Sequence, residues 1–437
     1  MKAIATQLAA IVTSQGVCEW EDIDATRMDA IKQAIATVTT PSCIVYPRTQ
    51  AELSAVIACA NSNNWRILTC GSGSKISWGG LVKGVQVVVS TQRLNQIIQH
   101  AVGDLTITVE AGTPFADIQS TLTSRGQFLA LDPSTPESAT IGGIVATADT
   151  NSLRQRYNSV RDQLLGISIV RADGQIASAG GRVVKNVAGY DLMKLFTGSY
   201  GSLGIITQVT FRVYPLPKAS GTVVLTGEAE AISKATSTLR GSALTPTSSD
   251  LLSTQIVANL GIGKGLGLVT RFGSISQSVK EQSQRLVEVG QQLGLQTAIY
   301  SDQAEADLWQ QLSTQIQNSP QKRSVTCKIG VLPSTAVATL KQLDQIAPQQ
   351  GNGLIHAGSG LGLLRFDPNV KTHTVLQMRT FCQTQGGFLS ILEAPVAFKQ
   401  QLDVWGYRGN AMELMRRIKQ QFDPKNILSP YRFVGGI

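Results

Sequence analysis

At 437 residues the chain is too long for one ordinary hydrophobic core, so its length predicts two or three domains. Hydrophobic residues make up 42% and charged residues 15% of it, a composition that excludes a disordered chain and describes a globular one. The net charge of +9 comes from scattered Lys and Arg residues, which favours attraction of small anions or an acidic protein partner and argues against nucleic acid.

The cysteines and histidines are too dispersed to predict a metal site. No two cysteines form a C-x-x-C pair, so zinc or iron–sulfur ligation within this chain is not expected. Reduced, mostly buried thiols are typical of a cytoplasmic protein, and we expect that location. No apolar run approaches the roughly 18 residues of a membrane helix, and the N-terminal AIATQLAAIV predicts an amphipathic helix. The residues concerned are Cys18, Cys43, Cys59, Cys70, Cys327, Cys382, His100, His356 and His373.

Hydrophobic periodicity predicts the first elements of the chain. Residues 1–37 are expected to be helical, because Ile31, Ala34, Ile35 and Val38 recur at helical spacing. A βαβ pattern with a glycine loop follows. Its elements are a strand at 43–47, an amphipathic helix at 49–61, a strand at 66–69, the loop at 70–80 and a strand at 85–89.

A second α/β unit begins near Leu105. A helix is predicted from Pro114 to just before Gly126, which is the expected distribution of proline and glycine at helix ends. Its other elements are a strand at 107–112, a loop at 131–147, a strand at 164–174 that ends in an Asp-Gly turn, and a strand at 206–214. The last strand closes a glycine-rich stretch over 182–217, which contains Gly189, Gly198, Gly201 and Gly204.

After Pro215 and Pro217, strands and helices alternate in a pattern that suits an antiparallel sheet backed by helices. A last helix at 411–422 precedes a C-terminal DPKNILSPYRF. The two remaining glycine clusters, at 261–267 and 358–362, are read as turns, and Trp309, Trp405 and Tyr407 as packing residues. Strands are predicted at 222–227, 266–271, 325–331, 353–366 and 387–392, and helices at 229–239, 277–293, 334–346 and 370–385.

Two glycine loops are candidates for phosphate binding. Backbone amides and hydroxyls without bulky side chains form anion-binding nests, and a dinucleotide needs several such contacts along its length. Either loop alone is equally well explained as a tight turn, and neither matches G-x-G-x-x-G or a G-K-[ST] loop. Together with the glycines of the 182–217 stretch they predict a flavin dinucleotide site. The residues are Gly71, Ser72, Gly73, Ser74 and Lys75 in the first loop, and Pro133, Ser134, Thr140, Gly142 and Gly143 in the second.

The same motifs resemble a known family. The prolines at 41 and 47, CGSGSK, DPSTPESATIGGIVAT, RDQLLGISIVRADG and KNVAGYDLMKLFTGSYGSLGIITQVTFRVYPLP are together similar to the FAD-binding domain of the vanillyl-alcohol oxidase type, over roughly 38–217. Within that family the chain resembles the smaller FAD-binding E subunits of bacterial glycolate oxidases, because of Lys75, the 185–206 string and FDPKNILSP.

The resemblance implies an α+β fold. It consists of an N-terminal helical segment (1–37), a two-part FAD-binding domain (38–217, divided at about 100), a smaller α+β second domain with an antiparallel sheet (218–400) and a C-terminal tail (401–437). It also implies that Gly71 to Lys75 wrap the pyrophosphate of FAD. Ser134, Thr140, Gly142 and Gly143 would then contact phosphates and the ribityl chain, and Gly204, Ile205 and Ile206 one end of the cofactor. Because the first loop contains no His and only the adjacent Cys70, non-covalent FAD is expected.

The implied function is that of an FAD-binding subunit of a glycolate (or D-lactate) oxidase or dehydrogenase complex, acting on a small 2-hydroxy acid. Its partners would be a larger FAD-containing catalytic subunit and an iron–sulfur subunit. Relatives that oxidise 2-hydroxy acids carry a histidine-rich second domain, whereas LIHAGSGLGLLRF contains only His356. No catalytic residue is therefore assigned, and His356 and Tyr407 are the candidates available. An FAD-bearing structural subunit and an independent oxidase of another small alcohol remain as alternatives.

Overall fold

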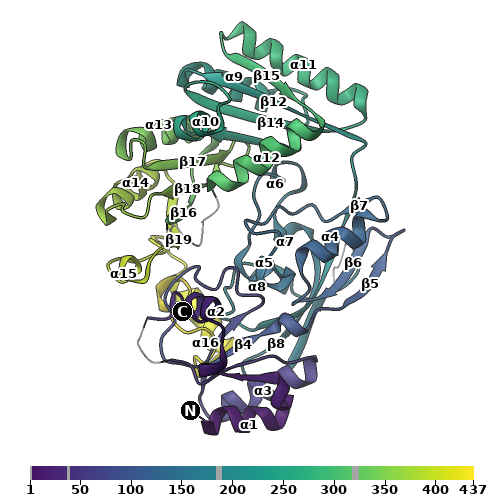
Figure 1. Cartoon of the computed structure of the whole chain (residues 1–437), viewed down its shortest axis with the longest axis vertical. Coiled ribbons are helices and arrows are strands. Elements are labelled where there is room, and N and C mark those ends of the chain that lie inside the picture. Colours follow the sequence, from purple (N-terminus) through teal and green to yellow (C-terminus); the bar gives the residue numbers. More distant parts are fainter. Residues whose placement is uncertain (1, 37–39, 184–188, 317–323) are drawn as a thin grey trace. The chain divides into compact units, whose positions relative to one another are not determined.

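The computed structural model describes residues 2–36, 40–183, 189–316 and 324–437 (Figure 1). The chain divides into two compact units. Unit 1 comprises 1–150, 159–216 and 407–437, and unit 2 comprises 151–158 and 217–406. Residues 37 and 38, where one expected segment ends and the next begins, and residues 185–188 of the glycine-rich stretch lie outside the described residues.

Unit 1 contains a four-stranded sheet in the order β1-β2-β4-β3. Its strands are β1 (Val17–Glu19), β2 (Cys43–Val45), β3 (Arg66–Cys70) and β4 (Val85–Ser90), with β2 and β3 both parallel to β4. The connecting helix α3 (Gln50–Ser62) is capped by the Thr49 side chain. It buries the apolar face predicted from its sequence, so the βαβ prediction is confirmed.

The N-terminal segment is only partly helical. Helices α1 (Lys2–Val12) and α2 (Ala25–Lys32) confirm part of the prediction. Residues 17–19 form β1 instead, because they pair antiparallel with β2. The expected helical position Ile35 lies beyond α2 and makes a β-bridge to Val82, so the helical reading was wrong there.

The second sheet of unit 1 is antiparallel and has the order β5-β6-β10-β8-β9. The predicted Asp-Gly turn at 173–174 joins β8 to β9, with Gly174 at φ +87°. Helix α4 (Phe115–Thr123) packs beside this sheet and is followed by the two-residue β7 (Gln127–Phe128). The strands of this sheet are β5 (Ile97–Ala101), β6 (Thr106–Glu110), β8 (Leu164–Val170), β9 (Ile176–Gly180) and β10 (Ile205–Arg212). Strand β11 (Tyr214–Pro215) pairs with β7 in a separate two-stranded sheet.

Part of the expected loop at 131–147 is a helix. Residues Ile141–Thr147 form α5, and the loop prediction was wrong there. Ile141, Ile144 and Val145 are all buried, and their i, i+3, i+4 spacing is helical. The adjacent glycines hide this spacing in the sequence. The short helices α6 (Arg154–Tyr157), α7 (Val160–Gln163) and α8 (Leu192–Phe196) follow along the chain.

The C-terminal residues of unit 1 extend the four-stranded sheet. After α16 (Met412–Phe422), the Ile67 amide donates to Ile427 O at 2.7 Å, and the Ser429 amide donates to Ile67 O at 2.8 Å. The resulting bridge between Ile67 and Leu428 is parallel. The segment expected as a tail therefore runs along β3.

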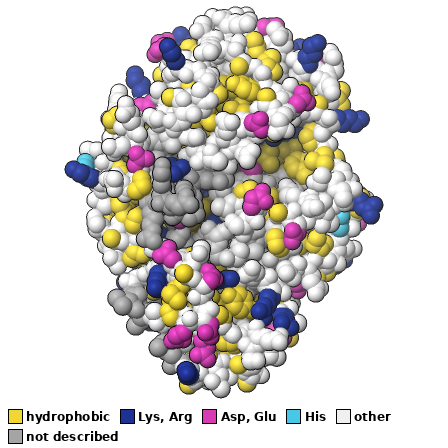
Figure 2. All heavy atoms as spheres, in the orientation of Figure 1, with side chains coloured by type: hydrophobic (Ala, Val, Ile, Leu, Met, Phe, Trp, Pro, Cys, Tyr) yellow, Lys and Arg dark blue, Asp and Glu magenta, His cyan; other side chains and the backbone are white. Residues whose placement is uncertain are grey.

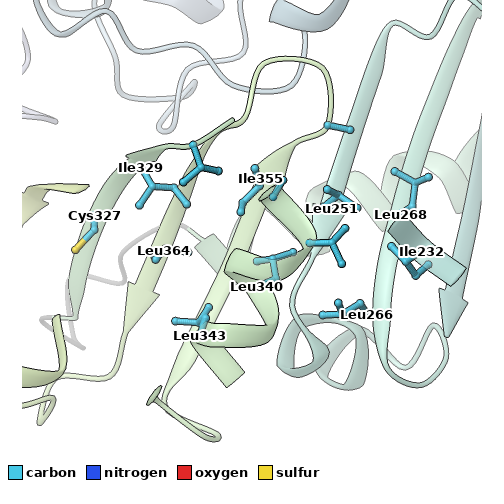
Figure 3. Packing of buried hydrophobic residues seen from close by; sticks show 14 of the residues in the cluster. Ile232, Leu251, Leu266, Leu268, Cys327, Ile329, Leu340, Leu343, Ile355 and Leu364 are labelled. Atoms are coloured by element: carbon cyan, nitrogen blue, oxygen red, sulfur yellow. The ribbon is translucent and has the colours of Figure 1, made fainter. Parts of the chain in front are cut away.

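Unit 2 is built on an antiparallel eight-stranded sheet in the order β15-β12-β14-β13-β17-β18-β16-β19, as the alternation in its sequence predicts. Neighbouring residues such as Leu251 and Leu252 belong to different hydrophobic clusters, so both faces of the sheet are covered. Figure 3 shows residues of the larger cluster, which packs the sheet against helices such as α13.

The elements of unit 2 are β12 (Ala219–Gly227), α9 (Ala229–Gly241), β13 (Ser248–Leu252), α10 (Thr254–Leu260), β14 (Leu266–Ser274), α11 (Ser276–Gln292), β15 (Gln296–Tyr300), α12 (Asp302–Ile316), β16 (Val325–Gly330), α13 (Ala336–Ile346), β17 (Gly351–His356), β18 (Leu361–Phe366), α14 (Thr372–Thr384), β19 (Phe388–Glu393) and α15 (Val396–Lys399). Elements β13, α10, β15 and α12 were not predicted from the sequence. Gly261 ends α10 in a left-handed conformation and Gly360 lies between β17 and β18, so both glycine clusters are turns, as predicted.

The surface shows no concentration of one charge on the face seen in Figure 2, where Lys and Arg side chains are dispersed. Within the described part of the chain, no helix combines the length and the apolar character needed to cross a membrane.

Candidate functional site

Unit 1 contains a pocket at the ends of β3 and α5 and the start of β10. All the predicted site residues except Pro133 and Ser134 are among those that line it. These are Gly71, Ser72, Gly73, Ser74, Lys75, Thr140, Gly142, Gly143, Gly204, Ile205 and Ile206. The structure thus brings the two glycine loops and the beginning of the last predicted strand of this domain together around one cavity.

The loop after β3 presents unused amides. No acceptor is found for the backbone N–H groups of residues 72–75 among the residues that the structure describes. The loop is held from its other side, because Ser90 Oγ donates to Gly71 O at 2.8 Å and Ser72 Oγ donates to Ser138 O. Gly73 has φ +92°, a conformation that favours glycine. Successive free amides beside such a residue form a nest suited to an anion.

Lys75 does not act as a free point charge at this loop. Its Nζ lies 3.1 Å from Asp149 Oδ2, and both side chains are almost fully buried. Asp149 also accepts hydrogen bonds from the Ser134 amide at 3.0 Å and from Ser134 Oγ at 2.8 Å. Ser134 therefore braces the ion pair, and the predicted direct role of Ser134 at the pocket wall has no support in this geometry.

The pocket has three walls. The first is the first glycine loop (71–75), the second is the second glycine loop with α5, and the third is the turn at 199–204. Tyr200 and Gly201 both have left-handed φ values, of +55° and +72°. The Tyr200 amide donates to Ala146 O of α5 at 2.8 Å, which ties the turn to the second wall. A Cβ at Gly201 would overlap Thr69 Oγ1 of β3, so glycine allows this close approach.

Arg432 lines the same pocket and was not predicted from the sequence. Its Nη2 donates to the carbonyl oxygens of Lys75 at 3.2 Å and Ile76 at 2.7 Å, so the C-terminal segment holds the first glycine loop. Burial lowers the pKa of the Arg432 guanidinium to about 10, and it remains charged at neutral pH. Because Asp149 neutralises Lys75, Arg432 contributes the remaining positive charge of these three residues.

Further residues of the wall were also missed, namely Thr69, Cys70, Ile76, Thr91, Ala146, Thr147 and Tyr200, whereas Gly201 belongs to the predicted glycines of the 182–217 stretch. Some of the missed residues gave a signal. Ala146 and Thr147 end the quoted IGGIVAT motif, Tyr200 lies within the quoted TGSYGSLG, and Arg432 follows NILSP by two positions. The set combines free amides, hydroxyls, one net positive charge and apolar faces such as Ile205 and Ile206. It fits a cofactor that has an anionic linker and a flat ring system.

The sequence around His356 suggested an isolated histidine. In unit 2, however, His356 has a hydrogen-bonding partner. Its Nδ1 lies 2.6 Å from Asp250 Oδ1, and Ser152 Oγ donates to the other carboxylate oxygen of Asp250. His356 and Asp250 are both buried. This arrangement fixes the orientation of the imidazole. The other candidate, Tyr407, accepts a hydrogen bond from the Ala411 amide, a local contact within unit 1.

Comparison with known proteins identifies the fold and the cofactor of unit 1. A solved structure of p-cresol methylhydroxylase with substrate bound superimposes with a TM-score of 0.79 and 16% identity, over 99% of this chain and 96% of that one. A protein-family model described as "FAD binding domain" matches residues 41–180, and one described as "FAD linked oxidases, C-terminal domain" matches residues 405–433. Residues 41–180 thus match an FAD binding domain, and the chain has the fold of p-cresol methylhydroxylase.

Curated relatives place this FAD-binding protein among oxidases and dehydrogenases. The glycolate oxidase subunit GlcD of Bacillus subtilis is 25% identical over 89% of the chain and 88% of its own length. A mitochondrial D-lactate dehydrogenase [cytochrome] of Arabidopsis thaliana is 25% identical over 91% of the chain and 74% of its own length. The glycolate oxidase subunit GlcE of Escherichia coli is 40% identical over 37% of the chain and 46% of its own length. The FAD-binding protein is an FAD-dependent oxidoreductase.

Proposed function

We propose that this oxidoreductase is an FAD-binding subunit of a glycolate (or D-lactate) oxidase or dehydrogenase complex that oxidises a small 2-hydroxy acid. The observation that carries the proposal is the pocket of unit 1, where a loop with free amides, Thr140 and the Arg432 guanidinium lie together in a domain matched to FAD binding. The substrate class comes from the relatives, which are named as glycolate oxidase subunits and D-lactate dehydrogenases.

The cofactor is proposed to be bound without a covalent bond. Among the residues described at the pocket wall, Cys70 is the one thiol and no imidazole is present. Burial raises the pKa of the Cys70 thiol, which disfavours the thiolate needed for attack on a flavin. The FAD-binding region would extend from 38 to 217 and be completed by the C-terminal residues that carry Arg432.

FAD supplies a hydride acceptor when it is bound. The residues of this chain would bind and orient it. The amides of 72–75 would receive the pyrophosphate, the Lys75–Asp149 pair would keep that loop in shape, and Arg432 would add positive charge. Oxidation of a 2-hydroxy acid removes a hydride from the α-carbon and a proton from the hydroxyl group, which leaves a 2-oxo acid. The proton acceptor for this reaction is not assigned in this chain.

The partners are proposed to be a larger FAD-containing catalytic subunit and an iron–sulfur subunit, in the cytoplasm. Two relatives are named as subunits of glycolate oxidases, which supports a multi-subunit assembly. The cysteines of this chain are dispersed in sequence, so electrons would leave it through a partner that holds clusters.

One experiment separates this proposal from its alternatives. The purified protein is expected to contain about one FAD per chain, released into the supernatant by acid precipitation. Anaerobic glycolate or D-lactate is then added to the protein alone and to the co-purified complex. Bleaching of the flavin in the complex but not in the isolated chain indicates a subunit whose chemistry lies in the partner. Bleaching in the isolated chain indicates an independent oxidase, and a chain that cannot be reconstituted with FAD contradicts the proposal.

The independent oxidase is the second candidate, because the alignments with GlcD and with the Arabidopsis D-lactate dehydrogenase cover both of this chain's units. An FAD-bearing structural subunit is the third. It predicts full FAD content, and in the co-purified complex either acid would bleach the flavin of the catalytic partner but not the flavin of this chain.

A further inference from the structure

Helix α16 carries a lysine on its inward face. Lys419 is only 6% exposed, while its neighbours Ile418 and Phe422 pack against the hydrophobic core of unit 1. A lysine usually extends its ammonium group to solvent from such a position. Here it does not, and burial lowers the pKa of the Lys419 ammonium while Asp423 opposes that shift.

All three N–H donors of the Lys419 ammonium have acceptors. Nζ donates to Ser202 O at 2.8 Å, to Asp423 Oδ2 at 2.6 Å and to Leu428 O at 3.0 Å. Asp423 in turn accepts hydrogen bonds from the amides of Ile427 and Leu428. The buried charge is therefore paired and fully hydrogen-bonded, which is the condition under which such a group is tolerated.

The acceptors belong to two segments that form the pocket. Ser202 lies in the 199–204 turn, whose Tyr200, Gly201 and Gly204 line the pocket. Leu428 lies in the C-terminal segment that bridges to β3, and β3 ends immediately before the first glycine loop. Arg432 follows Leu428 by four residues. One ammonium group thus joins the third wall of the pocket to the segment that holds the first wall.

We propose that Lys419 is a positioning residue for the cofactor. It sets the distance between the 199–204 turn and the C-terminal segment, and thereby the shape of the FAD pocket, without touching FAD itself. The inference rests on FAD binding by unit 1, and it adds a residue outside the pocket wall to the determinants of that binding. An uncharged side chain of the same length would leave two carbonyl groups and a carboxylate without their shared donor, and the turn would then be free to shift.

The test compares three variants with the wild-type protein. Lys419→Met keeps the length of the side chain and removes the charge. Lys419→Arg keeps the charge, but its planar guanidinium cannot reach three acceptors in the positions that an ammonium group satisfies. Arg417→Met is the matched control, because Arg417 lies on the same helix, is exposed, and pairs only with Glu413 among the described residues.

Each protein is freed of flavin, checked by far-ultraviolet circular dichroism and titrated with FAD. We expect Lys419→Met to raise the FAD Kd at least tenfold and to change the visible circular dichroism of the bound flavin. Lys419→Arg should raise the Kd about threefold or more, and Arg417→Met should leave it within twofold.

An unchanged Kd and an unchanged flavin spectrum in folded Lys419→Met would overturn the inference, even with a lower melting temperature, because Lys419 would then stabilise the fold alone. If Lys419→Met does not fold, the Arg variant decides: wild-type FAD affinity in it would equally overturn the inference. A wild-type protein that binds no FAD refutes the proposed function itself, and is thereby distinguished from failure of the positioning role.

Discussion

Gly71→Ala gives the sharpest test of the pocket geometry. Gly71 has an ordinary negative φ, so alanine itself would be tolerated by the backbone. A Cβ at this position would overlap Thr140 Oγ1, and would lie 3.0 Å from Thr140 Cβ and 3.1 Å from Cγ2. Both residues line the pocket, so the first glycine loop and the start of α5 would have to move away from each other.

The size of the effect follows from the cost of overpacking. Forcing one methyl group into a well-packed contact costs about 1–3 kcal/mol. If that cost falls on the conformation that binds FAD, the Kd rises roughly 5- to 150-fold, since about 1.4 kcal/mol is a factor of ten. Thr140→Ala alone should cost no more than one hydrogen bond, about 0.5–1.5 kcal/mol. In Gly71→Ala/Thr140→Ala the overlapping hydroxyl is gone, and the double variant should bind FAD more tightly than Gly71→Ala does.

The assay is fluorescence titration of the four apoproteins with FAD, read as a double-mutant cycle. Gly73→Ala is the control: its φ of +92° strains an alanine by about 1–2 kcal/mol, but no atom lies within 4 Å of the added Cβ. Removing Thr140 Oγ1 should therefore not rescue Gly73→Ala. Strictly additive effects of Gly71→Ala and Thr140→Ala would refute the close contact between the two walls.

Three further outcomes are expected. Burial raises the pKa of the Cys70 thiol, so alkylation of Cys70 in the apoprotein should become faster as the pH rises. Because Cys70 lines the pocket, bound FAD should suppress this alkylation, and mass spectrometry of the labelled peptide would measure both effects. Lys75→Met leaves Asp149 buried without its cation and should lower stability in urea by about 3–5 kcal/mol, whereas adding Asp149→Asn should restore at least half of the loss. Asp250→Asn should lower the stability of unit 2 by about 1.5–3 kcal/mol, because it weakens buried hydrogen bonds to His356 and Ser152. The FAD Kd should stay unchanged, and a higher Kd would contradict a pocket formed within unit 1.

Elements with a clear period were predictable from the sequence. Helix α3 shows a capping Thr49 and a buried face at Leu53, Val56 and Ile57, so its sequence carries all the information that fixes it. The antiparallel sheet of unit 2 was predictable for the same reason. Helix α12 was missed because only a few of its residues are apolar, and its position depends on packing against β12 and β17.

The pocket was predictable only where its residues follow one another in the chain. The loop from Gly71 to Lys75 can be recognised in the sequence from its glycines and hydroxyl residues. Arg432 contacts that loop across 357 positions, and His356 contacts Asp250 across 106, so no local pattern links either pair. The same limit hides the ion-pair partner of Lys75 from a reading of the loop alone. Asp149, which neutralises Lys75, stands in a separate part of the sequence.

The bond between β3 and the C-terminal segment also bears on how the protein is made. Thr69 and Ser429, which hydrogen-bond to each other, are 360 residues apart. At about 5–20 residues per second, a ribosome needs roughly 20 to 70 seconds to synthesise the chain between them. During that interval the edge of β3 has no partner and Arg432 is absent from the first glycine loop. FAD capture should therefore follow translation of the C-terminal segment, and nascent chains stalled before residue 423 should acquire no flavin.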